Sequence, residues 1–299
     1  MSAPSVKGDK VNPREEVSFR TTDGLRLAGW LYRPERTQPG PAIVLTHGTG
    51  CVKEMGLAPY AEFFCAAGYT CLVYDHRNLG ASEGEPRAEL DPWQQVSDMR
   101  DALTFLSMQD GVDPQKLGLW GTSYAGGHVI VAAAMDRRVR CVVAVVPTLS
   151  GYRSSTIGMS QEQIDTLVAS FADDRMARMR GEPPRRQKPT PPGSETGDWL
   201  HAFGAGTLYR GDLTLRSKEL RMSYEPVDFI GRIAPTPFLM VAVTHDERCP
   251  REEQLSGFER AQEPKRMVML EGGHYSVYDK ILTESAQAAV DWYRAHLPA

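Results

Sequence analysis

The 299-residue chain lacks a strong charge imbalance, a long apolar run and any close pair of cysteines. Its formal net charge of −4 gives no overall attraction to nucleic acid or to an anionic membrane surface. No apolar run approaches the roughly 18 residues of a transmembrane helix, and the first residues, MSAPSVKGDKVNPREE, contain no apolar core of a secretory signal. We therefore expect a soluble, cytoplasmic protein that binds neither nucleic acid nor membrane.

The cysteines are odd in number and show neither a CxxC pair nor a metal-ligand spacing. Three of them, Cys65, Cys71 and Cys141, lie within apolar runs, where a buried thiol acts as a small apolar side chain. The pattern favours a reducing compartment and gives no indication of a metal site.

The first half of the chain alternates strand and helix patterns. Two short alternating segments, 17–21 and 25–32, flank Asp23-Gly24, which is typical of a β-hairpin. Continuous apolar runs, typical of strands that are covered on both faces, follow at 42–46, 70–74, 116–120 and 141–146. Helical patterns separate them at 53–67, 92–108 and 124–135. This order predicts an α/β fold with a mostly parallel, doubly wound sheet.

Residues 149–225 interrupt the alternation. They contain an amphipathic helix at 160–180 and then the Pro-rich stretch GEPPRRQKPTPPGSETG, which predicts either a mobile functional loop or a disordered excursion. The alternation resumes with strands at 236–243 and 266–270 and helices near 251–262 and 279–296. We interpret residues 149–225 as a helical lid inserted between two segments of one core, residues 1–148 and 226–299.

The segment Gly121-Thr122-Ser123-Tyr124-Ala125 joins a predicted strand to a predicted helix. The pattern for a serine nucleophile on a sharp strand-to-helix turn is Gly-x-Ser-x-Gly, and here Ala125 stands in the fifth place. Alanine is small enough for that position, so Ser123 is the candidate nucleophile. The alternative is a glycine-rich turn with an incidental serine. Gly126 and Gly127 cost helix stability, which indicates close packing or open access to the serine.

A serine on such a turn needs an acid and then a histidine, in that order along the chain. The histidines that lie beyond its helix are His201, His245, His274 and His296. His274 follows the last apolar strand and Gly272-Gly273, so it is the candidate base, the alternative being a surface-loop histidine. Asp246 follows the preceding strand and is the candidate acid. Its neighbour Glu247 is chemically competent, and the choice between them rests on position alone.

Backbone amides that hold an oxyanion are expected after the nucleophile and after the third strand. They are the amides of Tyr124 and, within LTHGTG, of Thr49, with Gly48 as the alternative. His47 is expected to shape this loop. In the loop at 74–84, Arg77 either cross-links the loops around the site, which we favour, or meets a substrate carboxylate.

These features together resemble the α/β-hydrolase superfamily. Within it, GTSYAGGHV, HRNLGASEG, EPVDFIGRIAPTP and EGGHYSVY are similar to the dienelactone-hydrolase-like branch, which includes fungal polyketide transferases and thiohydrolases. The resemblance covers nearly the whole chain apart from the lid and the first dozen or so residues. It implies a triad of Ser123, Asp246 and His274 that acts on acyl esters or carrier-bound thioesters.

The predicted reaction is acyl transfer through an acyl-enzyme, and it needs no metal or organic cofactor. Alternatives are a peptidase, a C–C bond hydrolase, or a ligand-binding protein that retains the fold. The lid carries the candidate substrate-binding residues Met159, Phe171, Trp199 and Phe203, although packing among lid residues is an equal alternative.

Basic residues of the lid suggest a docking edge for an acidic acyl carrier protein, against the alternative of a solvated flexible loop. They are Arg175, Arg178, Arg180, Arg185, Arg186 and Lys188.

Overall fold

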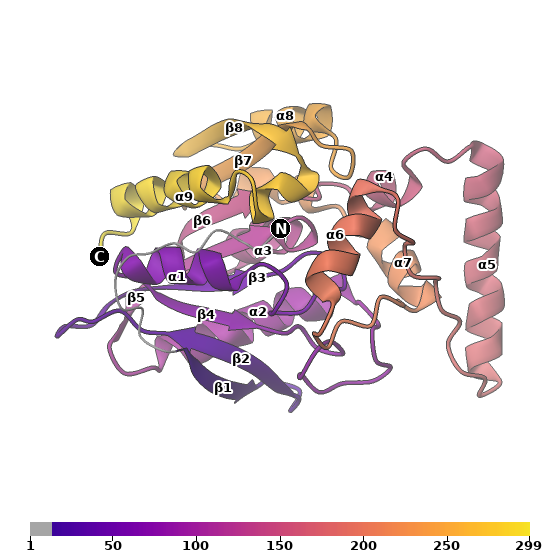
Figure 1. Cartoon of the computed structure of the whole chain (residues 1–299), viewed down its shortest axis with the longest axis horizontal. Helices are drawn as coiled ribbons and strands as arrows, with labels where there is room; N and C mark the ends of the chain where they lie inside the picture. The colour runs from indigo at the N-terminus through magenta and orange to yellow at the C-terminus, as the bar shows by residue number, and fades with distance from the viewer. Residues whose placement is uncertain (1–13) are drawn as a thin grey trace.

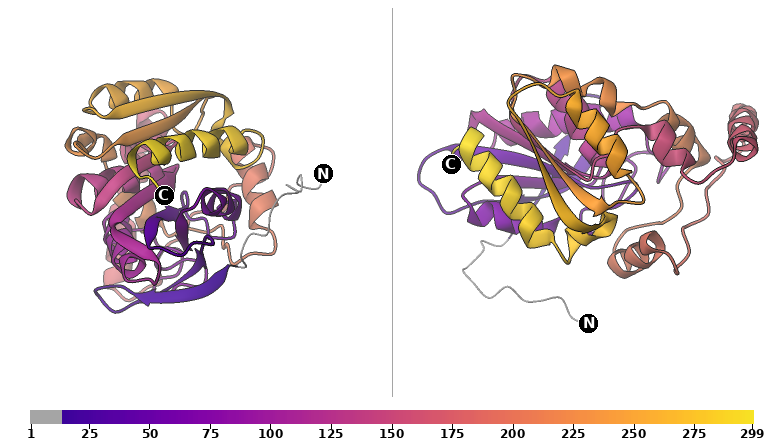
Figure 2. Two further views of the ribbon diagram at one scale, coloured as in Figure 1. Left: turned by 90° about the vertical axis from the view of Figure 1, so that its left-hand side faces the viewer. Right: turned by 90° about the horizontal axis from the view of Figure 1, so that it is seen from above.

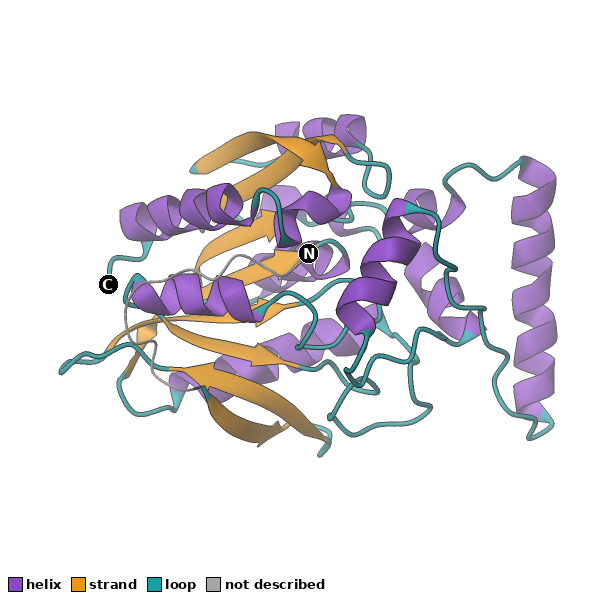
Figure 3. Ribbon diagram, in the orientation of Figure 1, coloured by secondary structure: helices purple, strands orange, loops and turns teal. Residues whose placement is uncertain are grey.

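The computed structural model describes residues 14–299, so the first 13 residues of the predicted core segment lie outside the described residues. Within 14–299, eight strands form one sheet in the order β1-β2-β4-β3-β5-β6-β7-β8 (Figures 1 and 3). The strands are β1 Glu15–Arg20, β2 Arg26–Tyr32, β3 Gly40–Thr46, β4 Thr70–Tyr74, β5 Val112–Thr122, β6 Val139–Val145, β7 Phe238–His245 and β8 Lys265–Gly273. The predicted hairpin is confirmed as β1–β2. The pairs β1–β2 and β2–β4 are antiparallel, and the five pairs from β4–β3 to β7–β8 are parallel.

Helices cover both faces of the sheet, as the continuous apolar strands require (Figure 2). Helices α1 and α9 pack on each other and on one face, while α2 and α3 pack together on the other. The core helices are α1 Ala58–Ala66, α2 Pro92–Ser107, α3 Tyr124–Met135, α8 Arg251–Glu259 and α9 Leu282–His296, with the short turns η1 Pro226–Asp228, η2 Ile230–Arg232 and η3 His274–Tyr278. The predicted α/β-hydrolase fold is confirmed. In residues 14–299 no helix combines the length and the apolarity that a membrane span requires.

One helix begins later than the sequence predicts. The pattern at 53–67 predicts a helix over the whole range, yet α1 starts only at Ala58. Asp75 accepts hydrogen bonds from the Lys53 amide (2.7 Å) and from Lys53 Nζ (2.9 Å), which holds this stretch against the end of β4. Pro59 then opens the helix in its first turn, where proline is favoured.

Arg77 cross-links the loop after β4 to the core, which is the favoured one of its two predicted roles. Arg77 Nε donates to Asp98 (2.7 Å) and Nη1 donates to Asp23 (2.9 Å), both through side-chain carboxylates. Within this loop, the Gly80 backbone lies close to the Asp75 carboxylate: a Cβ on Gly80 would stand 2.2 Å from Asp75 Oδ2. The Arg77 guanidinium is therefore already satisfied by the protein.

Four helices of the inserted segment lie beyond the strand ends, with α5 outermost and α6 and α7 between it and the sheet (Figure 1). They are α4 Gly151–Thr156, α5 Gln161–Met179, α6 Glu195–Gly204 and α7 Leu215–Met222. Helix α5 starts with a capping box formed by Ser160 and Gln163.

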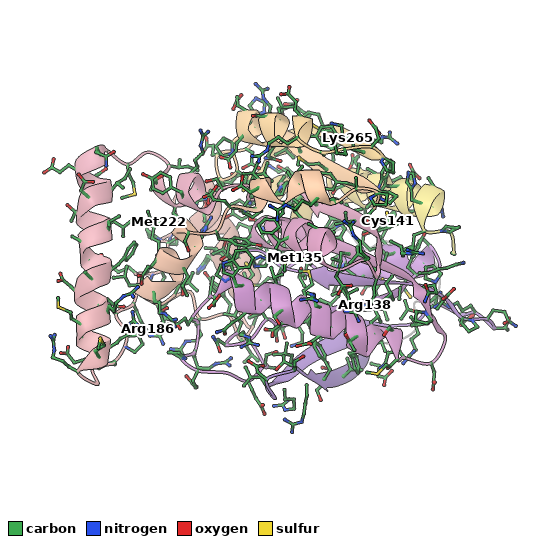
Figure 4. All side chains as sticks on the ribbon, turned by 180° about the vertical axis from the view of Figure 1, so that it is seen from behind. Met135, Arg138, Cys141, Arg186, Met222 and Lys265 are labelled. Carbon is green, nitrogen blue, oxygen red and sulfur yellow. The ribbon has the colours of Figure 1, made fainter. Side chains whose placement is uncertain are left out.

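The Pro-rich stretch is hydrogen-bonded to its surroundings. The Arg185 amide donates to Asp174 Oδ1 (2.9 Å), and the Gln187 amide donates to the Leu213 carbonyl (2.8 Å). Arg186, which Figure 4 labels beside α5, donates to the Arg87 carbonyl of the core (3.0 Å). These contacts argue against the alternative of a disordered excursion.

Candidate active site

Ser123 stands between β5 and α3 in a backbone conformation that non-glycine residues rarely adopt, with φ 56° and ψ −119°. Its amide donates to the Val145 carbonyl (2.9 Å), and its own carbonyl accepts from the Thr148 amide (2.9 Å). The end of β6 and the loop that follows it therefore hold the strained residue on both sides, as at a nucleophile elbow.

The glycines around Ser123 are required by close backbone approach. A Cβ on Gly121 would lie 2.3 Å from the Ala125 carbonyl oxygen. A Cβ on Gly126 would lie 2.8 Å from Pro147 Cα, and one on Gly127 would lie 2.6 Å from the Thr148 carbonyl oxygen. Of the two reasons weighed for Gly126 and Gly127, close packing of α3 therefore explains them. The methyl group of Ala125 is accommodated within the fully buried first turn.

The structure brings Ser123, His274 and Asp246 together from three strand ends. Ser123 Oγ lies 3.0 Å from His274 Nε2, and His274 Nδ1 lies 2.9 Å from each carboxylate oxygen of Asp246. His274 opens η3 directly after β8, and Asp246 follows β7. Because β5, β6, β7 and β8 are parallel, their carboxyl ends lie at one edge of the sheet, which is the edge where Ser123 stands.

Asp246 is itself fixed by further donors. Its Oδ1 accepts from the amides of Arg248 (2.9 Å) and Cys249 (2.7 Å), and its Oδ2 accepts from Gln254 Nε2 (3.2 Å). Both members of the His274–Asp246 pair are almost fully buried. The carboxylate therefore orients the imidazole ring with its other nitrogen toward Ser123.

The other candidate acid and histidines lie elsewhere. Glu247 points to solvent, and exposed His245 is hydrogen-bonded through Nδ1 to Thr244 Oγ1 (2.8 Å). His201 is exposed on α6, and the His296 ring packs on Trp292 at 4.0 Å. His47 is buried in the loop after β3, with its ring 4.9 Å from that of His76, and burial lowers its pKa.

The candidate oxyanion donors belong to two segments of backbone next to Ser123. Tyr124 is the first residue of α3, so its amide has no acceptor within the helix. On the opposite side, Gly48 comes so close to the nucleophile that a Cβ there would stand 3.1 Å from Ser123 Cβ. Gly48 and Thr49 both line the cavity in front of Ser123. Backbone from the start of α3 and from the loop after β3 thus flanks Ser123.

This cavity has a volume of about 410 Å³ and is closed on its far side by the inserted segment. Ser123 and His274 line it, and so do Met159 and Trp199 of the insertion. Phe171 and Phe203 do not line it. Phe171 is buried on α5, which packs on α7, and Phe203 stacks on Trp199 with ring centroids 4.9 Å apart. For these two residues, packing within the insertion is the alternative that the structure supports.

Two cysteines and three cations that the sequence analysis did not select also line the cavity. They are Cys51, Lys218, Arg221, Arg248 and Cys249. Burial raises the pKa of Cys51 to about 12 and that of Cys249 further above its ordinary range, so both are thiols at neutral pH. A thiol is a weak nucleophile compared with a thiolate, so neither cysteine competes with Ser123. The spacing of Lys218 and Arg221 was a usable signal, because residues three apart share a helix face.

One group in residues 14–299 has the composition of a metal site. Asp246, Cys249 and His274 each offer one ligand-type atom within 4.8 Å of the others. However, the Cys249 thiol stays protonated and bonds with Thr148 Oγ1 (3.3 Å), while His274 and Asp246 bond each other. The group therefore matches a hydrogen-bonded catalytic arrangement better than a cation site.

The predicted basic edge of the insertion is largely neutralised. Arg175 pairs with Glu219, Arg178 with Asp174, Arg180 with Glu182 and Arg186 with Asp212. In residues 14–299, no ion pair is recorded for Arg185 or Lys188. Intramolecular pairing thus removes most of the charge that the sequence assigned to a docking edge.

The comparisons with known proteins agree with this fold. The family model of the X-Pro dipeptidyl-peptidases (S15 family) matches residues 23–276. A thiohydrolase of Eupenicillium brefeldianum is 35% identical over 287 residues, covering 91% of each chain. The polyketide transferase grgF of a Penicillium species is 32% identical over 271 residues, covering 88% of this chain and 90% of that one. The crystal structure of the α/β hydrolase GrgF superposes with a TM-score of 0.86 at 31% identity, over 96% of this chain and 100% of that one. The chain therefore belongs to the α/β-hydrolase superfamily, in the group that includes the fungal thiohydrolases and polyketide transferases.

Proposed function

We propose that Ser123, His274 and Asp246 form a catalytic triad that cleaves an ester or thioester through an acyl-enzyme. One observation carries the proposal: a strained serine at a strand-to-helix turn is hydrogen-bonded to a histidine that a buried carboxylate orients, and it faces a cavity. The chain is accordingly an enzyme of the esterase and thioesterase type, acting as a hydrolase or an acyltransferase.

In the first step, Ser123 Oγ attacks the substrate carbonyl carbon while His274 Nε2 takes the hydroxyl proton. The bond from that carbon to the leaving oxygen or sulfur then breaks, and His274 returns the proton to the leaving group. Asp246 holds the ring and stabilises the imidazolium. A water, an alcohol or an amine next attacks the acyl-serine, giving up its proton to His274, which returns it to Ser123 Oγ.

The amides of Tyr124 and Thr49 hold the oxyanion of each tetrahedral intermediate in this proposal. Tyr124 begins α3 directly after Ser123, and Thr49 lines the cavity, so both donors are in place before the reaction in this scheme. Loss of one such donor typically slows the reaction by about 10²- to 10³-fold.

The names of the relatives favour a polyketide-type acyl chain as the cargo. Thiohydrolase and polyketide transferase relatives cover about nine tenths of this chain, so we propose an acyl thioester as the substrate and release or transfer of its acyl group. A peptidase is the second candidate because the matching family model is that of X-Pro dipeptidyl-peptidases. In this scheme residues 149–225 act as a lid that selects the acyl group.

An acyl carrier protein remains a proposed partner, with a smaller docking surface than the sequence suggested. Arg185 is exposed, and Lys188 is exposed at the cavity rim. Reversing the charge at Arg185 and Lys188 is expected to slow turnover of a carrier-bound thioester relative to the same acyl group on N-acetylcysteamine. An unchanged ratio of the two rates contradicts docking at this edge.

The triad is tested with a fluorophosphonate probe and intact-mass measurement. We expect one adduct on the wild type and none on Ser123→Ala, since the probe modifies only an activated serine. Absence of the wild-type adduct, or an adduct that persists in the variant, overturns the proposal and favours a non-catalytic ligand-binding protein.

Ester, thioester and anilide substrates with the same acyl group distinguish the candidate reactions. We expect thioesters and esters to be turned over faster than anilides. Faster cleavage of anilides, above all of X-Pro anilides, would favour the peptidase.

A further inference from the structure

The cavity in front of Ser123 is lined by cations without a matching anion. Lys218 and Arg221 come from α7, and Arg248 comes from the loop after β7. Among the cavity-lining residues of the described chain there is no aspartate and no glutamate. The charge is therefore of one sign, in a space that is open to the substrate.

The three cations have few partners in the protein. Arg221 Nη2 donates to Ser154 Oγ (2.9 Å), whereas its buried Nε has no hydrogen-bond partner. Over residues 14–299, no ion pair is recorded for Lys218, Arg221 or Arg248. By contrast, the adjacent Glu219 forms an ion pair with Arg175 of α5.

Holding these charges together without an anion costs free energy. Burial lowers the pKa of Lys218, and the charges of Arg221 and Arg248 lower it further. Burial also lowers the pKa of Arg221. A charge removed from water is normally paired, so a partner from outside the chain would relieve this cost.

The cluster and the reacting serine line the same cavity. The Arg221 guanidinium carbon is 5.3 Å from the centroid of the Tyr124 ring, and Tyr124 directly follows Ser123. Arg248 follows Asp246 by two residues, and its amide bonds the Asp246 carboxylate. An anion bound here would therefore belong to the molecule whose carbonyl meets Ser123. Arg77, the alternative carboxylate partner weighed from the sequence, is paired with Asp98 and Asp23 instead.

We propose that Lys218, Arg221 and Arg248 form a subsite that binds a carboxylate or phosphate group of the substrate. This inference rests on the proposed function, because it names a substrate class for the same site. The anion has two sources with shared chemistry: a carboxylate at the far end of the acyl group, or a phosphate of a phosphopantetheine-type leaving group. Guanidinium and ammonium groups bind both through charge-assisted hydrogen bonds.

Two pairs of substrates test the subsite and separate the sources. The first pair is the 4-nitrophenyl monoester of adipic acid, with a free carboxylate, and its methyl-capped diester. The second pair is butyryl-coenzyme A, with phosphates, and S-butyryl-N-acetylcysteamine. In at least one pair, the wild type is expected to favour the anionic member by about tenfold or more in kcat/KM. The pair that shows the preference identifies the source.

Variants assign the preference to the cluster. Lys218→Gln and Arg248→Gln are expected to bring the kcat/KM ratio of anionic to neutral substrate toward one, and Lys218→Glu is expected to bring it below one. Arg266→Gln is the matched control: this exposed residue follows Lys265, which Figure 4 places at the start of β8, away from α5. Fluorophosphonate labelling of every variant verifies that Ser123 is intact.

The outcomes separate the two claims. Hydrolysis of the neutral esters without an anionic preference in either pair, or a preference that survives Lys218→Glu, overturns the subsite and leaves the triad standing. If the wild type takes no fluorophosphonate label, the triad fails. The subsite is then measured by titrating Ser123→Ala, with and without Lys218→Gln, with monomethyl adipate and coenzyme A. Binding to neither ligand, or equal binding with and without Lys218→Gln, overturns it.

Discussion

The two walls of the cavity are built in different ways. The wall that carries Ser123 is main chain from the ends of parallel strands, where Gly121 and Gly127 let backbones approach so closely that a Cβ would collide. The opposite wall consists of side chains from the inserted segment, such as Met159 and Trp199. Backbone geometry tolerates little change, whereas side chains are replaced one at a time. The first wall therefore determines reactivity, and the second is where relatives with one chemistry can differ in substrate.

The largest expected effect lies on the first wall. Asp246→Asn should lower kcat by about 10⁴-fold, because the amide no longer holds His274 in the required tautomer. Glu247→Gln, a neutralisation of the neighbouring carboxylate, should leave kcat within about twofold, since Glu247 is exposed to solvent. Steady-state hydrolysis of a 4-nitrophenyl ester measures both variants. A similar loss of kcat in both variants would mean that activity depends on the conformation of the loop after β7 and not on the Asp246 carboxylate itself.

The same contrast explains what the sequence could predict. Strands, their parallel order and the places of Ser123, Asp246 and His274 follow from short patterns, since parallel strands bring their carboxyl ends to one edge. The sequence could not choose between Asp246 and Glu247 with certainty, because only the buried contacts to Cys249 and Gln254 separate them.

The sequence left two alternatives open where helices pack on helices. Phe171 and Phe203 are candidates for the cavity because they are large and apolar, but Phe171 lies on α5, which packs on α7, and Phe203 stacks on Trp199. Lys218 and Arg221 were overlooked for the opposite reason. Charged residues on a helix normally face solvent, and only the placement of α7 turns this face toward the cavity.

The next effect is on stability, in the loops that follow β3 and β4 of the core. Asp75→Asn should destabilise the protein by about 3 kcal/mol or more, because it takes the carboxylate partner from the nearly buried Lys53 ammonium. Glu54, which also contacts Lys53 Nζ at 2.9 Å, limits the loss. Chemical denaturation gives the free energy of unfolding. A change below about 1 kcal/mol would contradict the view that this loop is rigidly cross-linked.

His128 gives the core a defined response to acid. It is buried on α3, bonded to Tyr224 Oη and Gln95 Oε1 (3.0 Å each), and burial lowers its pKa from 6.5 to about 3. In the unfolded chain the His128 imidazole is protonated near pH 6.5, whereas in the folded chain it is protonated only near pH 3. The free energy of unfolding therefore falls as the pH drops through this window. Between about pH 8 and about pH 5 the loss from His128 is about 2 kcal/mol.

Denaturation at the two pH values, for the wild type and for His128→Gln, measures this contribution. The variant should lose less stability on acidification, whatever its absolute stability. His201→Gln, at an exposed site on α6, should keep the wild-type pH dependence. Equal pH slopes in the wild type and His128→Gln would assign the acid response to other groups.

The smallest effect is expected on the second wall. The Arg175–Glu219 pair joins α5 to α7, but Arg175 is 64% exposed, and exposed pairs contribute about 0–1 kcal/mol. Glu219→Gln should therefore lower the free energy of unfolding by less than about 1 kcal/mol and leave the rate of fluorophosphonate labelling unchanged, since Ser123 is held by the other wall. Because α7 also carries Lys218 and Arg221, its loosened attachment should appear as a higher KM for the bulkier of two acyl esters, with kcat nearly constant. A large loss of stability, or slower labelling, would mean that the inserted helices stabilise the turn that carries Ser123 and that the two walls are not independent.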